Sequence, residues 1–143
     1  MKSILYVSKA QLGAPDAGEE VDRIVAGARE KNRTNGISGM LVFTGDHFSQ
    51  VLEGAEEPLD ALMASIRRDQ RHHSLREFAR PVSARSFAAW SLGYEGQSTY
   101  VDRLVRSLFA SEPEADLGEA QAELQELMLL LAHQRGSALL PSA

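Results

Sequence analysis

The side chains best able to do chemistry are a phenol and two carboxamides in apolar surroundings: Tyr6, Asn32 and Gln50. Tyr6 lies in the stretch SILYVS, Gln50 lies in FSQVLEG, and Asn32 lies near the end of a periodic segment. They supply hydrogen-bond donors and acceptors but no ordinary acid, base or nucleophile. This set suits a flat ligand edged with carbonyl and N–H groups. The alternative interpretation is that Tyr6 and Gln50 bond each other and nearby backbone, and that Asn32 only caps a helix.

Gln50 is an unexpected residue for the inward face of a strand. Alternation along FSQVLEG places it between Phe48 and Leu52 on one face. A buried carboxamide has two donors and an acceptor to satisfy, and leaving one unpaired costs about 1–3 kcal/mol. We therefore expect a protein group or a ligand to meet it there.

The elements that must position these residues alternate between strands and helices. Apolar and alternating runs predict strands over 3–8, 37–43, 48–54, 75–82 and 86–92. Apolar residues at i, i+3, i+4 and i+7 predict a helix around Val21–Ala28 and another from Pro58 through Ile66. With right-handed crossovers, the order β-α-β-β-α-β-β predicts an α+β ferredoxin-like sandwich, a mixed five-stranded sheet with two helices on one face.

The sequence changes character after Tyr94, which divides the chain into a domain of residues 2–94 and a helical pair within 95–143. Apolar stripes predict one helix around Val101–Leu108 and another around Leu117–Leu131. Both are expected to cover the bare side of the sheet. The second stripe holds more leucines than one sheet face needs, which predicts a homo-oligomer or partner surface.

Composition narrows the class of protein. The 143 residues are 43% hydrophobic and 24% charged, as is ordinary for a globular protein. A net charge of −5 gives no basic face for nucleic acid or an anionic membrane, and the lack of cysteine excludes thiolate catalysis.

The start of the chain is too short an apolar run for a signal peptide, and no stretch approaches a membrane span, so a cytoplasmic location is the default expectation. His72 and His73 lack the spacing of a metal site, and no Rossmann or Walker phosphate motif occurs.

Five consecutive stretches resemble the blocks of a known family. They are ILYVSKA, AREKNRTNGISGMLVF, DHFSQVLEG, IRRDQRHH and RSFAAWSLGY, and they run in order from about Lys2 to Tyr94. Together they resemble the BLUF domain, the blue-light sensor using FAD, in a short form with C-terminal helices. The resemblance implies that the two helices between the strands clamp the isoalloxazine ring of a non-covalently bound FAD above the sheet.

The resemblance also assigns residues. It makes Tyr6 the photoactive tyrosine, Gln50 the switching glutamine and Asn32 a ligand of the flavin edge. Trp90 matches the family tryptophan on the last strand, and Leu92 stands where methionine is common. The further residues that the family places around the cofactor are Ile24, Phe48, Ile66, Asp69, Arg71 and His72.

The mechanism implied by the resemblance begins with electron and then proton donation from Tyr6 under blue light. Gln50 ends rotated or tautomerised, with a new hydrogen bond to the flavin C4 carbonyl and a small red shift. An amide suits this role because its two ends are nearly isosteric but differ as donor and acceptor. The chain is then a photoreceptor that signals to another protein through its C-terminal helices, and not an enzyme.

Two other functions remain open at this point. One is an acylphosphatase-type hydrolase on the same fold, which would want a backbone anion cradle with a positioned arginine. No glycine-rich loop after the first strand supplies that cradle. The other is a flavin-free interaction module, against which the intact set of Tyr6, Asn32 and Gln50 argues.

Overall fold

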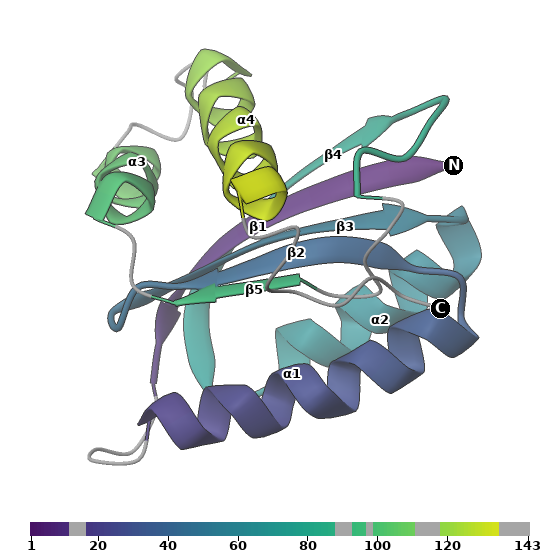
Figure 1. Cartoon of the computed structure of the whole chain (residues 1–143), viewed down its shortest axis with the longest axis horizontal. Helices are drawn as coiled ribbons and strands as arrows, with labels where there is room; N and C mark the ends of the chain where they lie inside the picture. The colour runs from purple at the N-terminus through teal and green to yellow at the C-terminus, as the bar shows by residue number, and fades with distance from the viewer. Residues whose placement is uncertain (12–16, 88–92, 97–98, 111–117, 135–143) are drawn as a thin grey trace.

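The fold is a β-sheet with a pair of helices on each face (Figure 1). The computed structural model describes residues 1–11, 17–87, 93–96, 99–110 and 118–134. Its strands are β1 (Lys2–Ala10), β2 (Ser38–Phe43), β3 (His47–Gly54), β4 (His72–Pro81) and β5 (Gly93–Gly96), in the spatial order β4-β1-β3-β2-β5. The first four pair antiparallel, and β5 runs parallel to β2. The predicted α+β ferredoxin-like fold is confirmed.

Helices α1 (Ala17–Thr34) and α2 (Glu56–Arg68) lie below the sheet in Figure 1. Val21 and Val25 of α1 and Leu59 and Met63 of α2 are buried against that face. Acidic residues in the first turn and basic residues in the last turn of both helices complement the helix dipole. The two predicted stripes therefore seat both helices on one face.

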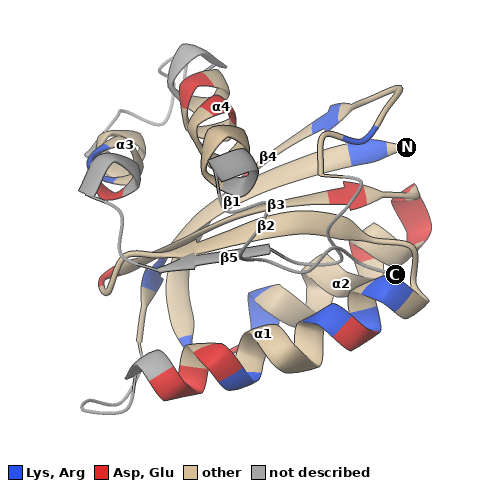
Figure 2. Cartoon of the chain, viewed as in Figure 1, with Lys and Arg blue, Asp and Glu red and all other residues tan. Residues whose placement is uncertain are grey.

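Helices α3 (Thr99–Ala110) and α4 (Gly118–Gln134) cover the opposite face. Val105 and Leu108 of α3 and Leu124 and Met128 of α4 share a core with the alternate residues of the central strands. The charged residues coloured in Figure 2 lie mainly on the helices and on the outer parts of the sheet, whereas the central strands β1, β2 and β3 carry no charged residue along their middles. The prediction that both C-terminal helices cover the bare side of the sheet is confirmed.

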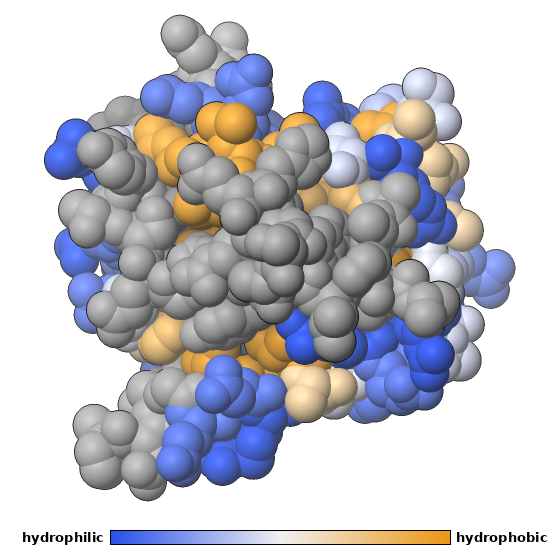
Figure 3. Space-filling view, in the orientation of Figure 1, coloured by the Kyte–Doolittle hydropathy of each residue, from blue (hydrophilic) through white to orange (hydrophobic). Residues whose placement is uncertain are grey.

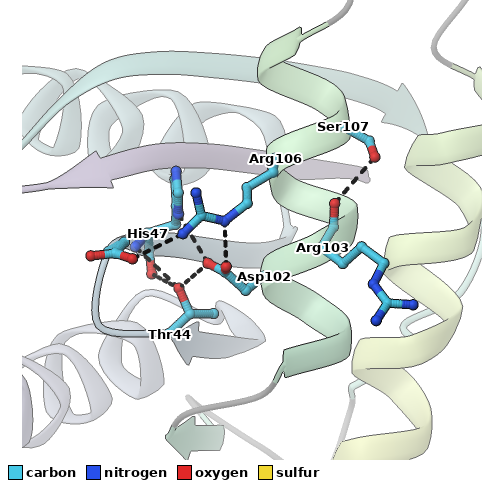
Figure 4. Close-up of polar contacts among 7 residues, drawn as sticks. Thr44, His47, Asp102, Arg103, Arg106 and Ser107 are labelled. Atoms are coloured by element: carbon cyan, nitrogen blue, oxygen red, sulfur yellow. Dashed lines mark hydrogen bonds and ion pairs between the residues drawn. The ribbon is translucent and has the colours of Figure 1, made fainter.

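A polar network joins α3 to the hairpin between β2 and β3 (Figure 4). The carboxylate of Asp102 accepts hydrogen bonds from Thr44 Oγ1 at 2.8 Å and Arg106 Nε at 2.6 Å, and His47 Nδ1 lies 3.0 Å from it. Arg106 also pairs with Asp46 at 3.0 Å. Although partial burial opposes ionisation, these hydrogen bonds together hold the pKa of Asp102 below its usual value.

The last predicted strand needs correction. Ser86 and Phe87 lie in a bend, residues 88–92 lie outside the described residues, and the fifth strand is Gly93–Gly96. The physical reason is that the backbone N–H groups of Ser86 and Phe87 donate to the side chain of Glu53 and not to a neighbouring strand. The division of the chain at residue 94 stays a prediction.

Gly39 of β2 lies too close to the facing strand β3 for any residue larger than glycine. A Cβ atom there would clash with the backbone carbonyl of Val51 on the facing strand. Gly36, at φ +66°, lies in the turn after α1, in the left-handed region that glycine adopts without strain. Among the described residues, no helix is long and apolar enough to cross a membrane.

Candidate functional site

A cavity of about 320 Å³ lies between α1, α2 and the sheet. Every predicted flavin-binding residue lines it: Tyr6, Ile24, Asn32, Phe48, Gln50, Ile66, Asp69, Arg71 and His72. Trp90 and Leu92 fall outside the described residues. The strands, the helices and the segment after α2 thus bring together side chains that are far apart in the sequence.

Tyr6 and Gln50 form the polar centre of the cavity floor. They are directly opposite each other in the antiparallel pairing of β1 with β3. Tyr6 Oη donates to Gln50 Oε1 at 2.5 Å, and the two residues are 5% and 6% exposed. Because the phenol donates to the oxygen, the Gln50 Nε2 group is left as a donor, and no hydrogen bond from it to a described residue is found. A buried amide donor on a cavity wall fits a ligand with a carbonyl edge.

The environment of Tyr6 keeps its phenol protonated. Burial raises the pKa of Tyr6 well above its ordinary value, and the nearby carboxylate of Asp69 raises it further. The hydroxyl is therefore a neutral hydrogen-bond donor throughout the physiological range. It holds its proton in a bond aimed at Gln50.

The two helices supply the side walls. On α1, Ile24, Ala28 and Asn32 face the cavity at spacings of four residues. On α2, Leu62 and Ile66 face it from the other side. These apolar side chains are only half-buried, because they border the cavity. Two apolar walls that stand apart fit a planar ring between them.

Asn32 belongs both to a wall of the cavity and to the end of α1. It is 2% exposed, and its backbone carbonyl accepts the N–H of Ile37 at 2.8 Å. The turn at Gly36 therefore fixes the backbone from which the amide side chain projects. Asn32, Tyr6 and Gln50 all line this cavity, and the role of Asn32 toward a ligand stays a prediction.

The rim of the cavity is mainly basic. Arg23 and Lys31 of α1 and Arg71 line it, and Asp69 supplies a carboxylate. Arg71 is held in place by that carboxylate, with Nε 2.9 Å from Oδ1 and Nη2 2.5 Å from Oδ2. The hydrogen bond from Arg71 is the main cause that lowers the pKa of Asp69, so the acid stays ionised. An anionic group on a bound ligand would find cations at this rim.

Sequence reasoning missed Arg23 and Lys31. They sit one residue before and seven residues after Ile24, so they flank the apolar stripe of α1 along the same side of the helix. That spacing was available as a signal. The spacing alone does not mark a site, because exposed basic residues on a helix are more often simply solvated.

His72 joins the floor of the cavity to the end of α2. Its Nε2 lies 2.7 Å from the carbonyl oxygen of Ile66, and its Nδ1 lies 2.7 Å from Ser8 Oγ. Its ring meets Tyr6 edge-on, with 5.9 Å between the ring centroids. Both ring nitrogens are engaged by the protein, so His72 shapes the cavity and orients its neighbours. Among the described residues there is no cluster of acids and histidines that could hold a metal ion.

Comparison with known proteins identifies the architecture. Residues 1–93 match the profile of the family described as BLUF, sensors of blue light using FAD. The chain belongs to the BLUF family. It is thus a blue-light sensor that uses a flavin, and the BLUF match favours this interpretation over the hydrolase and the flavin-free module.

The curated relatives of this BLUF chain are larger proteins. It is 30% identical over 93 residues to the photoactivated adenylate cyclase subunit beta of Euglena gracilis. That alignment covers 64% of this chain and 11% of the relative. It is 34% identical over 59 residues to the blue light- and temperature-regulated antirepressor BluF of Escherichia coli. That alignment covers 41% of this chain and 15% of the relative. The chain thus spans a small fraction of the length of these relatives.

Solved structures of similar size share the fold almost completely. The dark-state structure of the BLUF protein BlrB has a TM-score of 0.73 at 28% identity, and the alignment covers 91% of this chain and 96% of that one. The photo-activated state of BlsA has a TM-score of 0.74 at 23% identity, with the same coverage. The match includes the C-terminal helices, because it extends well beyond residue 93.

Proposed function

We propose that this chain is a blue-light photoreceptor in which Tyr6 and Gln50 form the switch and the residues around the cavity hold FAD non-covalently. The observation that carries this proposal is the 2.5 Å hydrogen bond from Tyr6 to Gln50 on the floor of a cavity between two apolar walls. Ile24 and Ile66 would enclose the flavin ring, and Asn32 and Gln50 would meet its polar edge. Bound FAD supplies the absorption of blue light and an electron acceptor.

The residues of the chain then perform the switching. With FAD bound, Tyr6 would pass an electron and its hydroxyl proton to the flavin and would later regain both. Gln50 receives that hydrogen bond in the dark, so loss of the proton removes the interaction that fixes its orientation. A rotated or tautomerised amide presents a different donor to the cofactor, with almost no change in shape. The packing of Phe48 and Leu41 around it can stay the same.

A light-minus-dark absorption difference spectrum of the FAD-loaded protein tests this function. We expect the wild-type flavin bands to shift slightly to the red under blue light and to recover in darkness. Gln50→Leu is expected to bind flavin and to lose the shift. Ser49→Ala is the matched control, because Ser49 directly precedes Gln50 on β3. This variant also removes a buried polar group, but from the face of the sheet that packs against α4. A shift that persists in Gln50→Leu would exclude the amide switch.

The basic rim supports FAD over riboflavin as the cofactor. Arg23, Lys31 and Arg71 provide cations that only a phosphorylated flavin can use. We expect Arg23→Gln and Lys31→Gln each to weaken FAD binding by about tenfold and to leave riboflavin binding unchanged. Equal losses for FAD, FMN and riboflavin in a binding titration would mean that these residues do not contact the phosphates.

We further propose that the signal passes from residues 2–94 to the helical pair within 95–143 and then to a partner protein, without catalysis by this chain. The name of the BluF relative describes an antirepressor regulated by blue light, which supports a partner as the target. The leucines of α4 support assembly as well, because Leu130 is 57% exposed. Figure 3 shows hydrophobic side chains at the surface around this helix.

A further inference from the structure

Glu53 is a buried carboxylate on the face of the sheet opposite the cavity. It is 1% exposed and is the second-to-last residue of β3. Its Oε1 accepts the Ser38 hydroxyl at 3.0 Å and the Phe87 N–H at 2.5 Å, and its Oε2 accepts the Ser86 N–H at 2.9 Å. A buried carboxylate is tolerated only when it is satisfied in this way. Glu53 therefore fixes the backbone of residues 86–87 to β3.

Arg85 extends this contact to the end of α1. Its Nη1 donates to Ser38 Oγ at 2.9 Å and to the Glu53 backbone carbonyl at 3.2 Å, and its Nη2 donates to the Gly36 carbonyl at 2.6 Å. The next N–H, that of Ile37, donates to the carbonyl of Asn32. The same side chains thus brace segment 85–87, β3 and the turn that precedes β2.

The strand that holds Glu53 also carries the switch. Gln50 lies three residues earlier on the cavity face, and Glu53 points to the other face. We propose that Glu53 is a positioning residue for the flavin response, because it ties the backbone of residues 85–87 to the strand that bears Gln50. A change at Gln50 reaches residues 85–87 through this tie. The inference rests on the proposed function of Tyr6 and Gln50.

A rival route leaves β3 at its other end. His47 lies three residues before Gln50 and contacts Asp102 of α3 (Figure 4). There, however, the partners of the carboxylate among the described residues are side chains, and the shortest contact, at 2.6 Å, is with Arg106, which is 58% exposed. Glu53 holds two backbone N–H groups in a buried site. The contact at Glu53 therefore constrains the main chain more firmly than the contact at Asp102 does.

Amide hydrogen exchange of the FAD-loaded full chain, in darkness and under blue light, tests the inference. We expect illumination to change the exchange of the Ser86 and Phe87 amides in the wild type, and Gln50→Leu to abolish that change. In Glu53→Gln one oxygen is replaced by a donor, so dark exchange of these amides is expected to rise by about tenfold, as for a lost hydrogen bond to a charged group. The flavin red shift should remain, with a dark recovery rate altered severalfold.

The control is Glu30→Gln, because Glu30 also accepts two hydrogen bonds from an arginine but is exposed on α1. It should change neither exchange nor recovery. If Glu53→Gln does not fold, Ser38→Ala removes one donor from the same carboxylate and should give a smaller change in the same direction.

The inference is overturned if Glu53→Gln, or Ser38→Ala in its place, leaves exchange at residues 86–87 and dark recovery as in the wild type. It is also overturned if the light-dependent change appears only in α3 and disappears in Asp102→Asn. A wild type without a red shift contradicts the proposed function first. These outcomes are distinct, because exchange of the Ser86 and Phe87 amides in the dark depends on the contacts of Glu53 and not on the switch.

Discussion

The two faces of this sheet are covered in the same way, by two helices each, but they are packed differently. Beneath α3 and α4, a buried apolar cluster that includes Leu5, Val42 and Val51 fills the space, and Leu124 and Met128 have no exposed surface. Beneath α1 and α2, the floor holds Tyr6 and Gln50, and the helices leave about 320 Å³ between them. One face is therefore packed for stability, whereas the other leaves space for a ligand.

The largest expected effect on stability lies on the filled face. Leu124→Ala should lower the free energy of unfolding by about 2–5 kcal/mol, because it leaves a cavity in a close-packed core. Ile24→Ala should cost clearly less in the flavin-free protein, because Ile24 already borders open space. Urea unfolding of both variants checks this. Equal losses would mean that the two faces are packed alike.

The gain in stability on binding flavin should depend on the cavity face and not on the filled face. A ligand at a hundred times its dissociation constant stabilises the folded state by about 2.7 kcal/mol. Ile66→Ala should lose much of that gain, because Ile66 forms a wall of the cavity. Leu124→Ala should keep the gain on top of its own lower baseline. The measurement is unfolding with and without saturating FAD, and a full gain in Ile66→Ala would contradict the placement of the ring.

These contrasts also show what the sequence could predict. The spacing of Val21, Ile24 and Val25 was enough to predict α1 and its inward face, because a helix side repeats every three to four residues. The site followed from the BLUF resemblance, since Tyr6, Asn32 and Gln50 lie far apart in the chain. The predicted strand at 86–92 was wrong at Ser86 and Phe87, because a buried carboxylate competes there for the backbone N–H groups. No local pattern reveals a competitor more than thirty residues away.

The contact between α3 and the hairpin gives the filled face a modest pH dependence. The depressed pKa of Asp102 means that its contribution is present above the ordinary carboxyl pKa and is lost as the pH falls through the lower, folded-state value. Asp102→Asn should therefore cost roughly 1 kcal/mol near neutral pH and less in acid, because hydrogen bonds to a charged group are lost. Asp46→Asn is the control, because Asp46 is 71% exposed. Urea unfolding at several pH values checks this, and an equal loss at every pH would contradict the assignment.

The smallest effect on stability should come from the outer side of α4. Leu130→Glu is expected to change the free energy of unfolding by less than about 0.5 kcal/mol, because the side chain is mostly exposed. It should nevertheless weaken self-association if α4 forms an interface between copies of the chain. Sedimentation of the wild type and the variant over a range of concentrations measures this. Identical profiles would remove Leu130 from the proposed assembly surface.

The central claim is that the hydrogen bond from Tyr6 to Gln50 lies against a flavin and is rearranged by light. The most direct test is the difference spectrum of Tyr6→Phe, which removes one hydroxyl and preserves the ring that packs beside His72. We predict that this variant takes up FAD and shows no reversible red shift under illumination that converts the wild type. A normal, reversible shift in Tyr6→Phe would contradict the account.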